Sequence, residues 1–329
     1  MALLLNRDNV KQLLTMRETI DIVEEAFRQQ ALGSVVMPLR TTMHLPDSHG
    51  AHLGMPAYIG GAVDALALKV VTVFPDNPAL HGLPTTMGIL LLNDAKTGTP
   101  LAVIEAGFLT AMRTGAVTGV AAKYLAKKVA RRVGIFGGGI QAQTQLMALS
   151  EVRDIESAVV FDRDMGKAKV FAEEMKRILA ISMTIAEDAR GAVEGVDIIV
   201  TASSATQPLF DGAWLTPGQH ISAIGTHTPA TREIDSTTIV RSKVVPDFID
   251  ACLSEAGDIL IPIQEGVFRK ELIHASLGEI IAGKKPGRVN NEEITFFKSV
   301  GLALQDAATA SYVYKKALAE NIGVEFNFT

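Results

Sequence analysis

The spacing of apolar residues near the start of the chain predicts an amphipathic helix. Between Arg17 and Leu32 the apolar positions recur at helical intervals, and Gly33 follows as a stop signal. The members of this apolar face are Ile20, Val23, Ala26 and Phe27. We therefore expect a helix at the surface of a larger domain, with one face buried.

The pattern changes from Val36 to about Asn93, where short alternating or apolar runs replace the helical spacing. These runs are separated by Gly, Pro, Asp and Asn, which are typical of turns. They read LRTTMHL, AHLGMPAYI, ALALKVVTVF and TTMGILLLND, and TPLAVIEA follows them. This texture predicts a mostly antiparallel sheet.

A long helical segment, LTAMRTGAVTGVAAKYLAKK, is followed by a regular alternation of strands and helices. The expected strands are VGIF, SAVVFD, SMTI, VDIIVTA, HISAIG and KVVPDF, and the first three are followed by the helical segments IQAQTQLMALSEV, MGKAKVFAEEMKRI and AEDARGAV. Parallel strands need connections of this length, and strands that are apolar throughout indicate a sheet covered on both faces. The pattern predicts a doubly wound α/β domain between about Ala130 and Gly287.

The final segment, from Glu292 to Ala319, is expected to be helical and to return to the first domain. The predicted fold is therefore α/β, with a Rossmann-type doubly wound parallel sheet at residues 126–291. It is inserted in a second, α+β domain made of residues 1–125 and 292–329, to which we assign substrate binding and dimerisation.

Composition narrows the class of protein. The chain has 329 residues, 48% of them hydrophobic, and a net charge of −5, so it can bury the cores of two domains. Lys and Arg are scattered along the chain, so the basic patch of a nucleic-acid-binding protein is missing. No apolar run is long enough to span a membrane. A single cysteine, Cys252, excludes an internal disulfide, so we expect a cytoplasmic protein. No His or Cys spacing indicates a metal site.

The segment VGIFGGGIQAQTQL carries a dinucleotide-binding pattern. It places Gly137, Gly139 and Ala142 in the arrangement G-x-G-x-x-A, directly after a strand and at the head of a helix that begins with Ile140 and Gln141. The first glycine permits a tight turn, the second lets a pyrophosphate approach the backbone, and the small third residue permits close packing of helix on strand.

An acidic residue supports this reading. Asp162 ends the next strand, 162 − 137 = 25 positions after the first glycine, close to the spacing of about 20 seen in such domains. Its carboxylate would accept hydrogen bonds from the adenosine ribose and repel a 2′-phosphate, which favours NAD over NADP. Arg163 beside it keeps NADP possible, because a guanidinium can pair with that phosphate.

Several segments together resemble the ornithine cyclodeaminase and mu-crystallin family, which includes archaeal-type alanine dehydrogenases and cyclic imino acid reductases. The resemblance extends along nearly the whole chain. The segments that carry it are MPLR (37–40), GMPAY (54–58), ALKVV (67–71), GLPTTMGILLLND (82–94), TAMRTGAVTGVAAKYLA (110–126), GGGIQAQ (137–143), IGTHTPATREID (224–235), LGEIIAGKKPGR (277–288) and SVGLALQD (299–306).

The resemblance implies roles for individual residues. Arg40, Lys69 and Arg113 would hold the carboxylate of a small amino or imino acid, and Lys69 would work beside its α-carbon. Guanidinium groups suit a carboxylate, and a lysine among them can have a lowered pKa and exchange a proton with an amine or imine. The residues implied in cofactor contact are Thr85, Arg113, Thr201, Ala202 and Ser203.

One position departs from the cyclodeaminase pattern. Where cyclodeaminases carry an aspartate that acts on the substrate amines, this chain has His227, and Asp235 follows eight residues later. A histidine can move a proton near neutral pH, but it is a poorer partner for the second ammonium group of ornithine. The alternative is that His227 only caps the loop or touches the cofactor.

Three functions remain open. The first, which His227 favours, is an NAD(H)-dependent dehydrogenase or reductase that interconverts an amino acid and its imino or keto acid. The second is an ornithine cyclodeaminase, and the third is a nicotinamide-dependent binding protein without important catalysis. The family resemblance further implies a homodimer formed through the sheet of the first domain, because exposed sheet edges invite pairing.

Overall fold

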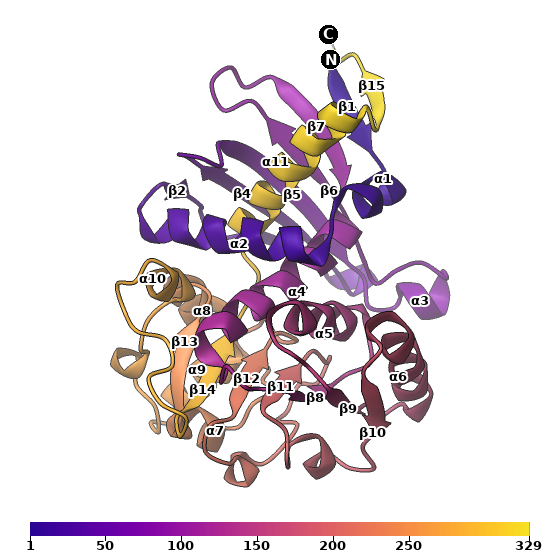
Figure 1. Ribbon diagram of the computed structural model, residues 1–329. Coiled ribbons are helices and arrows are strands. Elements are labelled where there is room, and N and C mark those ends of the chain that lie inside the picture. Colours follow the sequence, from indigo (N-terminus) through magenta and orange to yellow (C-terminus); the bar gives the residue numbers. More distant parts are fainter. Residues whose placement is uncertain (329) are drawn as a thin grey trace. The chain divides into compact units, whose positions relative to one another are not determined.

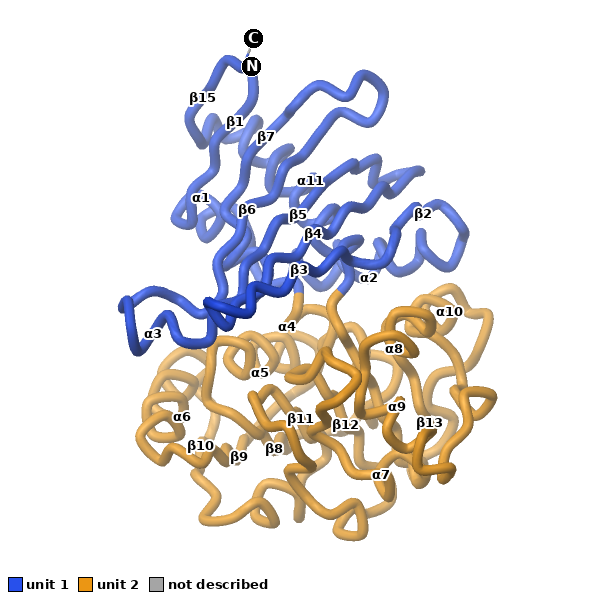
Figure 2. Tube along the Cα trace, turned by 180° about the vertical axis from the view of Figure 1, so that it is seen from behind, with its two compact units in different colours: residues 1–113, 302–329 blue, residues 114–301 orange. Residues whose placement is uncertain are grey.

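The computed structural model describes residues 1–328, and these form two compact units (Figure 2). Unit 1 contains Met1–Arg113 and the chain from Leu302 onward, and unit 2 contains Thr114–Gly301. The first boundary falls inside helix α4 (Ala106–Leu125). Unit 2 is thus an insertion between two parts of unit 1.

Unit 1 is built on a mixed, largely antiparallel sheet. Its order is β15-β1-β7-β6-β5-β4-β2, with β3 also paired to β4. Pairing is antiparallel except between β1 and β7. The strands are β1 (Ala2–Leu5), β2 (Val35–Val36), β3 (Thr41–Leu45), β4 (Gly50–Ile59), β5 (Ala65–Val73), β6 (Thr86–Asn93), β7 (Pro100–Glu105) and β15 (Val324–Phe326).

Helices cover one face of this sheet. Helix α11 (Ala303–Glu320) packs against β4 and β5 and against α2 (Met16–Ala31), as Figure 1 shows. The short helices of the unit are α1 (Arg7–Leu13), α3 (Asn77–Leu80) and the 3₁₀ turn η1 (Pro46–Ser48). The predicted amphipathic helix is α2, and its apolar face is buried.

The alternation of β5 explains how a lysine enters this core. Ala65, Ala67, Lys69 and Val71 are buried, whereas the residues between them are partly exposed. Successive side chains of a strand point to opposite faces, so Lys69 shares the covered face with apolar neighbours. In the sheet it lies opposite Met55 of β4 and Leu90 of β6.

Unit 2 is a parallel sheet in the order β10-β9-β8-β11-β12-β14-β13, which confirms the predicted doubly wound fold. Its strands are β8 (Arg132–Phe136), β9 (Ser157–Phe161), β10 (Ser182–Ile185), β11 (Ile198–Thr201), β12 (His220–Ala223), β13 (Ser242–Pro246) and β14 (Ile294–Lys298). Its helices are α5 (Ile140–Val152), α6 (Met165–Leu179), α7 (Ser236–Arg241), α8 (Ile249–Glu255), α9 (Gly257–Gln264) and α10 (Leu277–Ile281), with 3₁₀ turns η2 (Arg190–Ala192), η3 (Gly212–Trp214) and η4 (Lys270–Leu272).

Two predicted elements were wrong. The segment from Glu292 to Ala319 is not helical throughout, because Ile294–Lys298 forms β14 between β12 and β13. All five of its residues, including Thr295 and Lys298, are buried, and so short a run has neither a clear helical nor a clear strand periodicity. The segment AEDARGAV forms only the turn η2, since so short a segment, interrupted by Gly191, does not sustain a helix by itself.

Candidate functional sites

A cavity of about 740 Å³ opens at the carboxyl ends of the unit 2 strands, where doubly wound sheets bind ligands. Its volume is within the range of small-molecule and cofactor sites. The lining residues are Phe136, Gly137, Gly138, Gly139, Phe161, Asp162, Arg163, Asp164, Lys167, Ala202, Ser203, Ser204, Ala205 and Leu209. We call this cavity the dinucleotide cleft.

The glycine-rich turn has the properties that a phosphate-binding loop needs. Gly137 has φ +102°, and a Cβ there would lie 2.6 Å from the carbonyl oxygen of Ala202, so only glycine fits. A Cβ on Gly139 would meet no atom within 4 Å. Gly139 is the N-cap of α5 and supplies no side-chain acceptor for the first-turn N–H groups. These groups are therefore suited to an anionic phosphate.

Asp162 lies directly after β9 and binds the glycine-rich turn. Its Oδ2 accepts a hydrogen bond from the backbone N–H of Gly138 at 2.9 Å, and its Oδ1 accepts one from that of Asp164, also at 2.9 Å. Two cations, Arg163 and Lys167, line the cleft nearby. The carboxylate and the turn together have the composition that a nicotinamide dinucleotide site needs.

Some of the residues predicted for cofactor contact line the cleft, and others lie beneath or beside it. Gly137, Gly139, Asp162, Arg163, Ala202 and Ser203 line the cleft. Ile140, Gln141 and Ala142 form the first turn of α5, and Ala142 is buried in the core beneath it. Thr201 is also buried, and its hydroxyl donates a hydrogen bond to Glu233 at 2.9 Å.

Unit 1 contains a buried charged cluster, which we call the lysine cluster: Lys69, Arg113, Gln305 and Asp306. Nζ of Lys69 lies 2.7 Å from Oδ2 of Asp306, and Nε of Arg113 donates a hydrogen bond to Oδ1 at 2.9 Å. Nη1 of Arg113 also donates to Oε1 of Gln305 at 3.1 Å. Asp306 lies in the first turn of α11, where the helix dipole favours an acidic residue.

The cluster changes the acidity of Lys69. Burial lowers the pKa of its ammonium group to about 7, and the positive charge of Arg113 acts in the same direction. The carboxylate of Asp306 opposes this shift, whereas the charge of Arg40 adds to it. The three cations predicted to bind substrate are therefore electrostatically coupled, and Lys69 can exchange a proton near neutral pH.

Asp306 and Gln305 were not predicted as site residues. The segment SVGLALQD, which contains both, contributes only to the family resemblance. A usable signal was present in the sequence, because Gln305 and Asp306 are flanked by the apolar residues Ala303, Leu304, Ala307 and Ala308. A carboxylate on an apolar helix face requires a buried cation as partner.

Two predicted residues lie in loops. Thr85 is partly buried before β6, and its carbonyl accepts a hydrogen bond from the N–H of Phe74 at 2.8 Å. His227 is exposed in the loop after β12, whereas the preceding Thr226 is buried.

The described residues hold neither a metal-ligand cluster nor a membrane-spanning helix. Within residues 1–328, no group of three or more His, Cys, Asp or Glu side chains converges as metal ligands would. In the same residues, no helix combines the length and apolar character needed to cross a membrane.

Comparison with known proteins identifies the family. The Δ1-pyrroline-2-carboxylate reductase of Bacillus cereus is 38% identical over 99% of this chain and 100% of its own length. The structure of the Thermococcus litoralis Δ1-pyrroline-2-carboxylate reductase with NADH and L-proline is 48% identical, covers 98% of this chain and 100% of its own, and has a TM-score of 0.96. An archaeal alanine dehydrogenase dimer with bound NAD is 38% identical over 100% and 99%, with a TM-score of 0.94.

The match is not limited to the Rossmann-type unit. The family model described as "Ornithine cyclodeaminase/mu-crystallin family" matches residues 2–321, which includes the lysine cluster, the dinucleotide cleft and His227. The resemblance inferred from sequence segments is thereby confirmed, and the chain belongs to the ornithine cyclodeaminase/mu-crystallin family.

Proposed function

We propose that the protein is an NAD(H)-dependent oxidoreductase that reduces a small cyclic imino acid, Δ1-pyrroline-2-carboxylate, to L-proline. The observation that carries this proposal is that buried Lys69 and Arg113 pair with the same carboxylate, that of Asp306, and that burial together with the charge of Arg113 lowers the pKa of Lys69 to about 7. The substrate class follows from the names of the reductases to which the chain is similar. Oxidation of alanine is the second candidate, because an alanine dehydrogenase is comparably similar.

The residues of the lysine cluster match what this reduction needs. An imino acid presents a carboxylate and a C=N group, and its reduction adds a hydride to carbon and a proton to nitrogen. Arg40 and Arg113 would bind the carboxylate, which suits a guanidinium, and Lys69 would hold the proton at Nζ and deliver it. When bound, the dinucleotide supplies the hydride.

The dinucleotide cleft supports NAD as the preferred cofactor. Gly137 and Gly139 would hold the pyrophosphate against the start of α5, and Asp162 would accept hydrogen bonds from the ribose. Arg163 and Lys167 line the same cleft and keep NADP as a weaker alternative. We assign cofactor contacts also to Thr85 and Ser203.

His227 separates this function from cyclodeamination. Ornithine cyclisation requires a partner for a second ammonium group, and a carboxylate serves this better than an imidazole. The exposed His227 suits a reaction in which a single nitrogen gains or loses a proton. Ornithine cyclodeaminase activity is therefore our third candidate function, after reduction of the cyclic imino acid and oxidation of alanine.

One assay tests these functions. Purified protein is mixed with NADH and Δ1-pyrroline-2-carboxylate, with NAD⁺ and alanine, or with NAD⁺ and ornithine, and nicotinamide absorbance and ammonia are followed. We expect stoichiometric loss of NADH with the cyclic imine, which Lys69→Met reduces by roughly 10²- to 10⁴-fold, the usual contribution of a positioned acid or base. Ammonia release from ornithine without net change in NADH would instead show a cyclodeaminase.

We further propose that the protein is a homodimer of the cytoplasm. Six apolar side chains of unit 1 that are at least 38% exposed lie around β2, β3 and the start of β6: Val36, Leu39, Met43, Leu45, Met87 and Ile89. Such a patch beside an edge strand is suited to a subunit interface. The buried lone Cys252 is compatible with a reducing compartment.

Light scattering at micromolar concentration tests the dimer. Met43→Glu and Ile89→Glu should both convert the dimer to a monomer, because each places a charge in the apolar patch. Leu318→Glu is the matched control, since Leu318 is 51% exposed on α11, away from those strands. A monomeric wild type, or a dimer unaffected by both substitutions, would refute this interface.

A further inference from the structure

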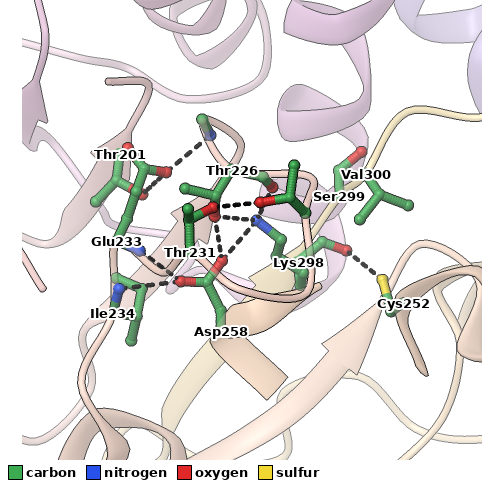
Figure 3. Close-up of polar contacts among 12 residues, drawn as sticks. Thr201, Thr226, Thr231, Glu233, Ile234, Cys252, Asp258, Lys298, Ser299 and Val300 are labelled. Carbon is green, nitrogen blue, oxygen red and sulfur yellow. Dashed lines mark hydrogen bonds and ion pairs between the residues drawn. The ribbon is translucent and has the colours of Figure 1, made fainter. Parts of the chain in front are cut away.

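Unit 2 contains a second buried charged cluster, formed by Glu233, Asp258 and Lys298, which the proposed reaction does not use. All three side chains are fully buried. They come from the loop after β12, from α9 and from the end of β14 (Figure 3). Charges are rarely buried unless they are paired and hydrogen-bonded, so their contacts indicate what the cluster holds in place.

Glu233 accepts hydrogen bonds from residues at the ends of two strands, β11 and β12. Its Oε1 accepts hydrogen bonds from the backbone N–H and the hydroxyl of Ser203, at 2.8 and 2.7 Å. Its Oε2 accepts them from the hydroxyl of Thr201 at 2.9 Å and the N–H of Gly225 at 2.8 Å. One carboxylate therefore joins the segment after β11 to the segment after β12.

Asp258 binds the backbone of Glu233, and Lys298 in turn pairs with Asp258. Oδ1 of Asp258 accepts a hydrogen bond from the backbone N–H of Glu233 at 2.7 Å, and Oδ2 lies 2.7 Å from Nζ of Lys298. Nζ of Lys298 also donates to the carbonyl of Thr226 at 2.6 Å, and the hydroxyl of Thr226 donates to Asp258 at 2.8 Å. Thr226 immediately precedes His227, so the same cluster fixes the residue next to that histidine.

The contacts reach the cofactor site through one residue. Ser203 lines the dinucleotide cleft, together with Ala202 and Ser204. Its N–H and hydroxyl hydrogens are both directed to Glu233, so its role in the cleft depends on that carboxylate. Thr201, in contrast, does not line the cleft, although it binds the other oxygen of Glu233.

We propose that Glu233 is a positioning residue for dinucleotide binding, which sets the cleft wall at Ser203 while Asp258 and Lys298 hold its backbone and charge in place. The inference rests on the proposed function only in taking the cleft as a dinucleotide site. A wall preset by buried hydrogen bonds binds its ligand without first ordering a loop, and this avoids an entropic cost of binding.

The test uses Thr201, because its side chain does not line the cleft and its hydroxyl donates to Glu233. Thr201→Val removes one donor to Glu233 at nearly constant volume, and Thr201→Ser retains it. Thr295→Val is the control, since Thr295 is equally buried in β14. Its hydroxyl donates to the carbonyl of Leu125 at 2.9 Å and also contacts His220 and Arg288, none of which lines the cleft. Glu233→Gln removes the charge itself. The measured quantities are the Kd of NADH, from its fluorescence in the absence of imino acid, and the Tm.

We expect Glu233→Gln to weaken NADH binding by about tenfold, the equivalent of one charged hydrogen bond, and Thr201→Val to weaken it about threefold. Thr201→Ser and Thr295→Val should stay within twofold of wild type, even though Thr295→Val lowers the Tm. Equal losses of affinity in Thr201→Val and Thr295→Val would overturn the proposal, as would an unchanged Kd in Glu233→Gln. A wild type that binds NADH but reduces no imino acid would refute the proposed reaction and leave this result intact.

Discussion

Nζ of Lys69 lies 2.7 Å from Oδ2 of Asp306, and both side chains are only 1% exposed. The same carboxylate accepts a hydrogen bond from Arg113, so one negative charge is shared by two cations. When both cations are protonated the cluster keeps a net positive charge, and a buried positive charge attracts the carboxylate of an amino or imino acid. Asp306 thus holds Lys69 and Arg113 together without neutralising them.

The charge of Asp306 should set the pH dependence of reduction. Because this carboxylate raises the pKa of Lys69, Asp306→Asn should lower that pKa further. Lys69 donates a proton only in its protonated form, so activity is present below its pKa and is lost as pH rises through it. We therefore expect the descending limb of kcat against pH to move from about 7 to lower pH. Asp94→Asn, in a surface turn of unit 1, is the control and should leave the limb in place.

Loss of Arg40 should shift the same limb in the opposite direction. The positive charge of Arg40 lowers the pKa of Lys69, so Arg40→Gln should raise it and extend activity to higher pH. The KM for the imino acid should also rise, by about tenfold or more, because a guanidinium that binds a carboxylate is worth about 1.5–3 kcal/mol. Initial rates between pH 6 and 9 give both quantities. A raised KM with an unmoved limb would mean that Arg40 binds substrate without acting on Lys69.

Local sequence pattern predicted most of the fold, because periodicity reports which face of an element is buried. The alternation around β5 and the helical spacing of α2 both depend on neighbours within one element. The pattern is ambiguous at β14, where Thr295, Phe296 and Phe297 are buried on both faces of the sheet. A run this short that is buried on both faces fits a helix or a central strand equally well, and only its pairing with β12 and β13 distinguishes the two.

The contacts within the two charged clusters could not be predicted from local sequence pattern either. Lys69 and Arg113 were predicted from family segments, whereas Asp306, which joins them, was not. Its contact with Arg113 spans 193 residues of the chain, and no local spacing encodes such a contact. Glu233 lies within a recognised segment, yet its partners Thr201 and Ser203 are 32 and 30 residues away. Long-range pairing of buried charges requires the tertiary structure.

Asp162 should govern the choice between NAD and NADP. Its carboxylate binds the N–H groups of Gly138 and Asp164, which keeps it at the end of β9 where a ribose would lie. Asp162→Ser removes the negative charge that opposes a 2′-phosphate and leaves Arg163 and Lys167 in the cleft. We expect the Kd of NADH to rise and that of NADPH to fall, so that their ratio changes by about tenfold or more. If wild type already prefers NADPH, Arg163 and Lys167 dominate and this assignment is wrong.

His227 provides the final test, since it replaces the aspartate of the cyclodeaminases. If its imidazole exchanges a proton with the substrate, His227→Ala should lower kcat by roughly 10²-fold or more and alter the pH profile. His227→Asp restores a carboxylate that can pair with a second ammonium group, and it should increase ammonia release from ornithine while reduction of the cyclic imine falls. Both variants should bind NADH within twofold of wild type, because the anchor at Thr226, held by Lys298 and Asp258, is unchanged. An His227→Ala enzyme with an unaltered rate and pH profile would show that the histidine only shapes its loop, and Lys69 would then be the sole proton donor among the residues proposed for this site.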